Sequence, residues 1–321
     1  MEAATPELNP AQQQVVDLLG AAGSDRPQFD AGLRHELRAE LEQQLEPVMA
    51  RLPADQQLFV SKHKLSQVHG CEARYLAEEA GDFSWSVPVA RGSVAHKAIE
   101  LGVSWRGEPV PADLVDETMA RLAQGNDGLA DWLRTCGDGD RAELRGQAVE
   151  RVTSFFECFP PLKARWRPVL EGKVRVELFD NRLILSGKTD LSLGAASGTT
   201  AGKVLIDFKT GGFTPSHIDD LRFYALLETL KIGTPPRLLA SYYLESGQPH
   251  PERVTEGLLD AALARTVDGV ARMVELLHDG RVASTRPGPA CRWCPILEGC
   301  EVGPAWLAGD DPERFDAEGD D

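Results

Sequence analysis

The sequence lacks any long apolar run. No stretch of about 18 hydrophobic residues occurs in its 321 positions, so a membrane-spanning helix is not expected. The first ten residues, MEAATPELNP, contain neither a basic nor an apolar segment, so they do not predict a secretory signal. Hydrophobic residues still make up 42% of the chain, which is enough for a full core. We therefore expect a cytoplasmic protein that does not bind membranes.

Positive charge is also scarce. The chain has 34 Lys and Arg against 50 Asp and Glu, a formal net charge of -16. This imbalance argues against nonspecific coating of nucleic acid. Part of it is local, because residues 309–321 contain seven acids and one arginine and predict an acidic disordered tail. A nucleic-acid-binding protein of this charge would need its basic residues gathered in one groove.

Cysteines are few, but three of the six lie close together. In a chain without a secretory signal they are better candidates for metal ligands or buried thiols than for disulfides. The segment CRWCPILEGC places Cys291, Cys294 and Cys300 in a C-x2-C-x5-C pattern, typical of a four-thiolate iron–sulfur or zinc site. The spacing does not say whether Cys71, Cys136 or Cys158 is the fourth ligand.

Hydrophobic periodicity predicts a helical first half and an α/β second half. Helical spacing occurs at 34–52, 61–80 (with Ser61 as N-cap), 92–105, 111–125 and 140–159. After Pro160-Pro161 the pattern changes to a hairpin over 171–194 that turns at Asp180-Asn181, then a small-residue loop over 194–203. A strand at 204–209, a helix closed by Gly233, a strand at 236–246 and a helix over 255–280 follow.

The stretch KVLIDFKTGG places an acid and a base at the end of a buried strand. Residues two apart on a strand share a face, so Asp207 and Lys209 project together. If the strands on either side of the 194–203 loop pair, Asp190 approaches Asp207. Two neighbouring carboxylates repel, and a divalent cation such as Mg²⁺ or Mn²⁺ relieves that cost. The pattern indicates metal-assisted phosphodiester hydrolysis, in which Lys209 orients or deprotonates water or stabilises the anionic transition state. The alternative is a structural Asp–Lys ion pair.

GKTD followed by VLIDFKTG resembles the PD-(D/E)XK nuclease superfamily, specifically its RecB-like exonuclease branch. The resemblance implies an α/β fold with a restriction-endonuclease-like core, a central mixed β-sheet flanked by helices. It also implies a metal site formed by His96 from GSVAHKAIE, Asp190, Asp207 and the backbone carbonyl of Phe208. Asp190, Asp207 and Lys209 would be the catalytic residues.

The resemblance extends to further positions. Glu171 in PVLEGK matches an acid at the start of the first core strand. The segment DLRFY keeps Tyr224 as a DNA contact but has Asp220 where the family often has Gln, which leaves the DNA-positioning role of this helix open. We expect Arg222 and Trp166, which belongs to KARWR, to bind DNA with Tyr224, because basic and aromatic side chains hold unpaired strands.

The resemblance also selects a fourth cysteine. RecB-like nucleases with an iron–sulfur cluster, AddB-like and small CRISPR-associated enzymes among them, place one cysteine before the nuclease core and three after it. This implies a [4Fe–4S] cluster on Cys71, Cys291, Cys294 and Cys300, with Zn²⁺ as the alternative ion. A cluster bound by these four cysteines would link the C-terminal segment to the early helices. Cys136 and Cys158 are then free or buried thiols.

The predicted organisation has five segments. They are an N-terminal helical segment (1–60), a helical region with Cys71 and His96 (61–160), the nuclease core (161–285), the cysteine cluster (286–308) and the acidic tail (309–321). The predicted function is a Mg²⁺- or Mn²⁺-dependent DNA exonuclease that acts on single-stranded ends in repair or recombination, with a helicase or repair protein as partner. The alternatives are a CRISPR spacer-acquisition nuclease and a non-catalytic iron–sulfur DNA-binding adaptor subunit.

Overall fold

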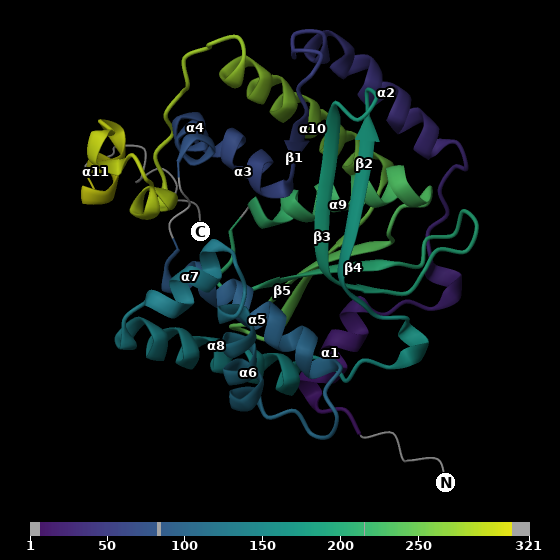
Figure 1. Cartoon of the computed structure of the whole chain (residues 1–321). Helices are drawn as coiled ribbons and strands as arrows, with labels where there is room; N and C mark the ends of the chain where they lie inside the picture. Colours follow the sequence, from purple (N-terminus) through teal and green to yellow (C-terminus); the bar gives the residue numbers. More distant parts are fainter. Residues whose placement is uncertain (1–6, 82–84, 215, 310–321) are drawn as a thin grey trace. The chain divides into compact units, whose positions relative to one another are not determined.

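The structure is a computed structural model that describes residues 7–81, 85–214 and 216–309 (Figure 1). Its α-helices are α1 (Pro10–Leu19), α2 (Leu33–Met49), α3 (Lys62–Gly70), α4 (Glu72–Ala80), α5 (Val87–Val103), α6 (Pro111–Ala123), α7 (Gly128–Thr135), α8 (Asp138–Cys158), α9 (Ser216–Ile232), α10 (Glu256–Leu277) and α11 (Val302–Ala308). Its strands are β1 (Leu58–Val60), β2 (Val169–Leu178), β3 (Leu183–Leu193), β4 (Val204–Lys209), β5 (Leu238–Tyr243) and β6 (Gln248–Arg253). Within the described residues, no helix is both long enough and apolar enough to cross a bilayer.

The chain folds into two compact units, each assembled from separate stretches of sequence. The first unit comprises Met1–Ala39, Trp85–Val176 and Ser186–Leu263. The second comprises Glu40–Ser84, Glu177–Leu185 and Ala264–Asp321. The five segments expected from the sequence remain a prediction, and the acidic tail beyond Gly309 lies outside the described residues.

A mixed β-sheet forms the framework of the first unit. Strand β3 pairs antiparallel with β4, β4 runs parallel to β5, and β5 pairs antiparallel with β6. The β3–β4 pairing confirms the hairpin expected around the small-residue loop. Gly194 in that loop has φ 78°, and a Cβ atom there would lie 2.5 Å from the Gly202 carbonyl oxygen, so the tight return of the chain requires glycine.

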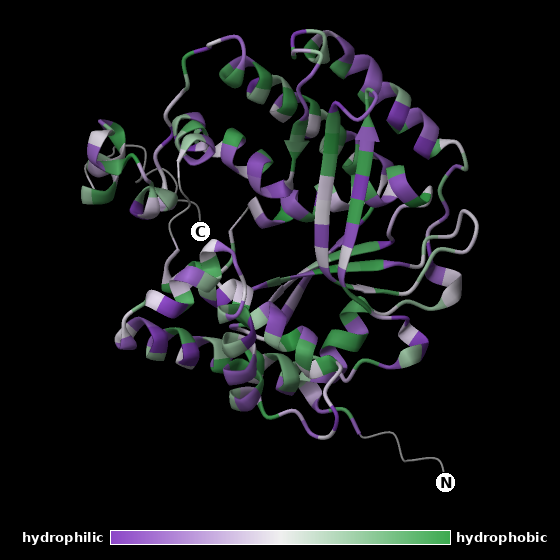
Figure 2. Ribbon diagram, in the orientation of Figure 1, coloured by the Kyte–Doolittle hydropathy of each residue, from purple (hydrophilic) through white to green (hydrophobic). Residues whose placement is uncertain are grey.

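The apolar residues of α1, α5, α6, α7 and α8 form one core together with the apolar residues on one face of this sheet. The core includes Val94 and Ile99 of α5, Phe155 of α8 and, from the strands, Ile206 and Tyr242. Figure 2 shows hydrophobic and hydrophilic residues alternating along these helices, as expected for helices with one buried side. The α/β fold class with a mixed sheet flanked by helices is confirmed.

The second unit contains α3, α4, α11, most of α2 and α10, and a short parallel pairing. Leu58–Val60 of β1 pair with Leu183–Leu185, the first residues of β3. Ser61 caps α3 as predicted, because its side chain accepts a hydrogen bond from the Lys64 amide.

Several predicted boundaries are wrong. Helix α5 begins at Val87, five residues before Gly92, because Pro88 in its first turn suits a helix start. The single helix expected over 61–80 is broken at Cys71, whose backbone is extended (φ -135°, ψ 109°). Strands β1 and β6 were not predicted, since β1 has only three residues and β6 contains two prolines.

Candidate active site

The two predicted aspartates lie at adjoining positions of β3 and β4. Leu191 and Ile206 are Cα partners, and Asp190 and Asp207 are the next residue on each strand. Both are buried, with 5% and 1% of their surface exposed. The Asp190 carboxylate accepts a hydrogen bond of 2.6 Å from the Phe208 amide, which fixes it against the end of β4. Pairing of the hairpin therefore places the two acids at neighbouring positions on adjacent strands, and their sharing of one cation stays a prediction.

Asp190 also meets residues from two other elements. His96 of α5 places Nδ1 3.2 Å from Asp190 Oδ1, and Glu171 of β2 completes a group whose ligand atoms all lie within 4.8 Å of one another. Imidazole and carboxylate donors at this separation could hold one divalent cation. Glu171 has a left-handed backbone (φ 53°), uncommon for a non-glycine residue and often found at functional sites. Lys188 forms an ion pair with Glu171.

Lys209 lies between two carboxylates. Its Nζ is 2.8 Å from Asp207 Oδ2 and 3.0 Å from Asp220 Oδ2 of α9. Asp207 is outside the three-residue group around Asp190, and its carboxylate contacts this ammonium instead. Asp220 is where the resemblance expects Gln, so the departure noted in the sequence supplies a charged partner for the predicted catalytic lysine.

The structure does not gather the three predicted DNA-binding residues at this site. Tyr224 is 2% exposed, and its ring lies where a Cβ atom on Gly187 would be, 2.3 Å from Cε1. Burial of that ring removes it from any surface that DNA could contact. Arg222 bonds Glu252 through Nε and Nη2, and these bonds raise the pKa of its guanidinium. Trp166 is half-buried in the short turn Ala164–Trp166 and lines a separate cavity.

An aromatic patch that sequence reasoning missed lies beside Lys209. Tyr243 of β5 is the Cα partner of Lys209. Its ring is 4.9 Å from that of His250 and 6.1 Å from that of Phe213, while His217 Nδ1 lies 3.1 Å from the Tyr243 hydroxyl. Phe213 is 54% exposed, unusual for so apolar a side chain, and stacks on His250. The signal available in the sequence was the alternation of Ser241 and Tyr243, which places the tyrosine on the face of Asp207 and Lys209.

The four predicted cluster cysteines line one apolar hollow in the second unit. Cys71 lies between α3 and α4, and Cys291, Cys294 and Cys300 lie in the turns before α11. Backbone amides of Arg286, Gly288 and Gly303 donate to the sulfurs of Cys71, Cys291 and Cys300 at 3.4–3.5 Å. Burial raises the pKa of the Cys294 thiol. All six cysteines are free of disulfides, and Cys136 and Cys158 belong to the first unit.

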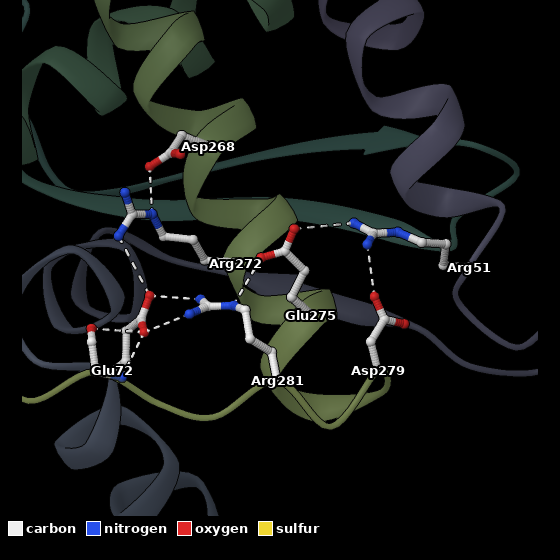
Figure 3. A network of polar contacts seen from close by, with 8 residues as sticks. Arg51, Glu72, Asp268, Arg272, Glu275, Asp279 and Arg281 are labelled. Atoms are coloured by element: carbon white, nitrogen blue, oxygen red, sulfur yellow. Dashed lines mark hydrogen bonds and ion pairs between the residues drawn. The ribbon is translucent and has the colours of Figure 1, made fainter.

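A polar network adjoins this hollow (Figure 3). Glu72, the first residue of α4, is 2% exposed and accepts hydrogen bonds from both terminal nitrogens of Arg281 and from the amide and hydroxyl of Ser284. The Arg281 bonds lower the pKa of Glu72 to about 2. Arg272 of α10 adds a second cation, whose Nη1 lies 3.4 Å from the Glu72 carboxylate. The network fixes Cys71 against the chain that leads to Cys291.

Comparison with known proteins shows the family of the chain. The family model described as the PD-(D/E)XK nuclease superfamily matches residues 60–301. The chain belongs to this superfamily. Membership confirms the restriction-endonuclease-like fold class. It also agrees with the hard-cation donors around Asp190, since PD-(D/E)XK nucleases use divalent metals.

Two solved structures resemble this PD-(D/E)XK protein at low identity. A protein named "Putative exonuclease" from Eubacterium rectale is 13% identical, with a TM-score of 0.48 over 86% of this chain and 94% of its own. A protein named SSO0001 is 11% identical, with a TM-score of 0.36 over 84% of this chain and 95% of its own. No curated protein matches the sequence.

Proposed function

We propose that the protein is a RecB-like DNA exonuclease that hydrolyses phosphodiester bonds at single-stranded ends with Mg²⁺ or Mn²⁺, in repair or recombination. The observation that carries the proposal is the meeting of His96, Glu171 and Asp190 beside the Asp207–Lys209 pair in a PD-(D/E)XK chain. An ordinary structural ion pair would not need a histidine and a third acid from other elements within 4.8 Å.

The donor set suits a hard divalent cation. His96, Glu171, Asp190, Asp207 and the Phe208 carbonyl would hold it, supplying mostly oxygen ligands as Mg²⁺ and Mn²⁺ prefer. When bound, such a cation neutralises charge on the scissile phosphate and acidifies the attacking water. The burial of Asp190 and Asp207 fits this role, because a buried negative charge is costly unless a cation compensates it.

Lys209 would act on the phosphate or the water. Its ammonium ends on the Asp207 side of the site, where it can stabilise the anionic transition state or orient the nucleophile. Asp220 would hold the ammonium when the metal engages Asp207. Lys209 would then have a carboxylate partner both with and without a bound metal.

The preference for single strands rests on the aromatic patch. Phe213 and His250 stack on each other next to Tyr243, so an unpaired base could continue the stack while its phosphate lies near Lys209. Base stacking on aromatic side chains contributes about 1–3 kcal/mol per base and tolerates any sequence.

The test is digestion of 5′- and 3′-labelled single and double strands by the full chain with Mn²⁺, Mg²⁺ or EDTA. Asp207→Asn and Lys209→Ala should each lower the cleavage rate at least about 100-fold, the range expected for loss of a catalytic group. Lys203→Ala is the matched control, because it breaks the Lys203–Glu228 ion pair just before β4 without touching the site. Normal cleavage by both site variants would refute the assignment.

We also propose that Cys71, Cys291, Cys294 and Cys300 bind a [4Fe–4S] cluster that stabilises the C-terminal segment. Three amide N–H groups already point at the sulfurs, as is usual around iron–sulfur clusters. Among the described residues, no three of the four sulfurs lie within 4.8 Å of one another. Thiolates on one tetrahedral zinc are about 3.8 Å apart, given Zn–S of about 2.3 Å. A four-iron cluster holds its thiolates further apart because each binds a different iron.

Anaerobic purification and a visible spectrum test the cluster. The wild-type chain should be brown with bound iron, and Cys294→Ser should lose the colour and unfold at a lower temperature. Cys136→Ser should keep both, because its sulfur lies near the Leu133 carbonyl in the first unit. A colourless wild-type protein that binds zinc instead would contradict the iron assignment.

A further inference from the structure

A cavity in the first unit lies away from the candidate active site. It has a volume of about 240 Å³. Its lining is Val15, Val16, Leu19, Gly20, Ala21, Arg26, Phe159, Pro160, Arg165, Trp166, Leu193, Gly194, Gly202, Val204 and Arg237. None of these residues belongs to the metal or lysine group. Val204 begins β4 and Asp207 and Lys209 end it, a separation of roughly 10–17 Å at about 3.3 Å per residue.

The charge of this lining is opposite to that of the chain. It contains three arginines and no acid, in a protein with 50 acids and 34 bases. Arg26 and Arg165 form no ion pair within the described ranges. The Nε of Arg237 is buried without a hydrogen-bond partner there, although its Nη2 bonds the Leu19 carbonyl. Burial and the charge of Arg26 lower the pKa of the Arg237 guanidinium. An anion would relieve this repulsion and satisfy the buried N–H.

The cavity also presents an aromatic wall. Trp166 is held by a 2.6 Å hydrogen bond from the Gly194 amide to its carbonyl, and the next residue, Arg167, has a left-handed backbone (φ 50°). Lys163 Nζ lies 5.6 Å from the centre of the Trp166 ring. Leu19, Phe159 and Leu193 add apolar surface. Cations around a flat aromatic and apolar wall match a ligand with both a phosphate and a planar ring.

We propose that this cavity, the arginine pocket, binds a nucleotide, with its phosphate at Arg26, Arg165 and Arg237 and its base against Trp166. Its volume lies just below the usual range for ligand pockets, about 300–1,000 Å³, so it holds one nucleotide and not a run of several. A simple anion site would need no tryptophan, and an apolar ligand would leave the buried Arg237 Nε unsatisfied. The ligand is either the terminal nucleotide of a strand or a free nucleotide.

The test is calorimetric titration of the full chain with dAMP, deoxyribose 5-phosphate and inorganic phosphate, in EDTA so that no hydrolysis occurs. The double variant Arg26→Gln, Arg165→Gln should weaken dAMP binding at least about tenfold, since it removes two charged contacts. Arg106→Gln with Arg253→Gln removes the same charge from two exposed arginines outside the pocket and should leave dAMP binding within about twofold.

A tryptophan variant separates base recognition from phosphate recognition. Trp166→Leu should reduce the affinity for dAMP to that for deoxyribose 5-phosphate, while the half-exposed Trp105→Leu should change neither. Displacement of dAMP by a 5′-phosphorylated tetranucleotide identifies a strand end as the ligand, and absence of displacement identifies a free nucleotide. The proposal is overturned if wild-type protein does not bind dAMP, or if the double arginine variant binds it unchanged. This experiment measures nucleotide binding and not cleavage. Its result therefore tests the arginine pocket even if the nuclease proposal fails.

Discussion

The position of the Lys209 ammonium between Asp207 and Asp220 sets the chemistry at the end of β4. In the proposed nuclease, a bound cation and the Lys209 ammonium would compete for the Asp207 carboxylate. Asp220 gives the ammonium a second partner, so Asp207 can turn to the cation without leaving the lysine unpaired in a partly buried place. We therefore assign Asp220 as a positioning residue for Lys209, on the basis of the proposed nuclease function.

Neutralising Asp220 should raise the metal concentration that the enzyme needs for cleavage. In Asp220→Asn, Lys209 binds Asp207 alone, so the Mn²⁺ concentration for half-maximal cleavage should rise and kcat should fall, each by about 10–100-fold as for other supporting residues of metal sites. Asp220→Glu should recover part of the activity because it restores the charge. Unchanged metal dependence in Asp220→Asn would show that this carboxylate is only structural.

At the level of elements, Glu72 joins α4 to the end of α10 and to the chain before Cys291. Its pKa of about 2 lies below the ordinary 4.5, so its contribution to stability is complete above pH 4.5 and is lost as the pH falls toward 2. This lowering of the Glu72 pKa corresponds to stability on the order of 3 kcal/mol. Glu72→Gln should lose that amount at neutral pH.

Urea unfolding from pH 7 to pH 2 measures this loss. The stability difference between wild type and Glu72→Gln should shrink as the pH drops below about 4.5 and vanish near 2. Glu275→Gln is the matched control in the same network, and its more exposed ion pairs with Arg51 and Arg281 should contribute less than about 1 kcal/mol. A constant difference across the pH range would show that the Glu72 charge does not stabilise the fold.

Some of these structural features could be predicted from the sequence and others could not. Period-two alternation and the small-residue loop were enough to predict the β3–β4 hairpin, which puts Asp190 and Asp207 at neighbouring positions on paired strands. Burial of Tyr224 could not be predicted, because it depends on Gly187 leaving room for the ring across the sheet. The sequence showed Asp220 only as a departure from the Gln that the family often has there. It did not predict the ion pair between Asp220 and Lys209. The aromatic patch and the arginine pocket join residues from distant segments, which local patterns cannot bring together.

At the scale of the whole molecule, net charge alone is a poor guide to what the protein binds. The chain has a net charge of -16, yet the first unit contains a cavity lined by three arginines and no acid. The negative charge of the rest of the chain disfavours nonspecific binding along DNA. It leaves basic cavities of this kind as the favourable sites for anionic ligands. The two units also differ in their candidate metal ligands, because the group of His96, Glu171 and Asp190 lies in the first and the four cysteines of the apolar hollow lie in the second.

The central claim is that His96, Glu171 and Asp190 hold one divalent cation, and direct Mn²⁺ binding tests it without reference to activity. Titration followed by electron paramagnetic resonance should find a Mn²⁺ site in the wild-type chain. Asp190→Asn and Glu171→Gln should each weaken it at least about tenfold, since each removes a charged ligand. Glu228→Gln breaks a similar ion pair with Lys203 and should leave it unchanged. Equal Mn²⁺ affinity in wild type and both site variants would contradict the account.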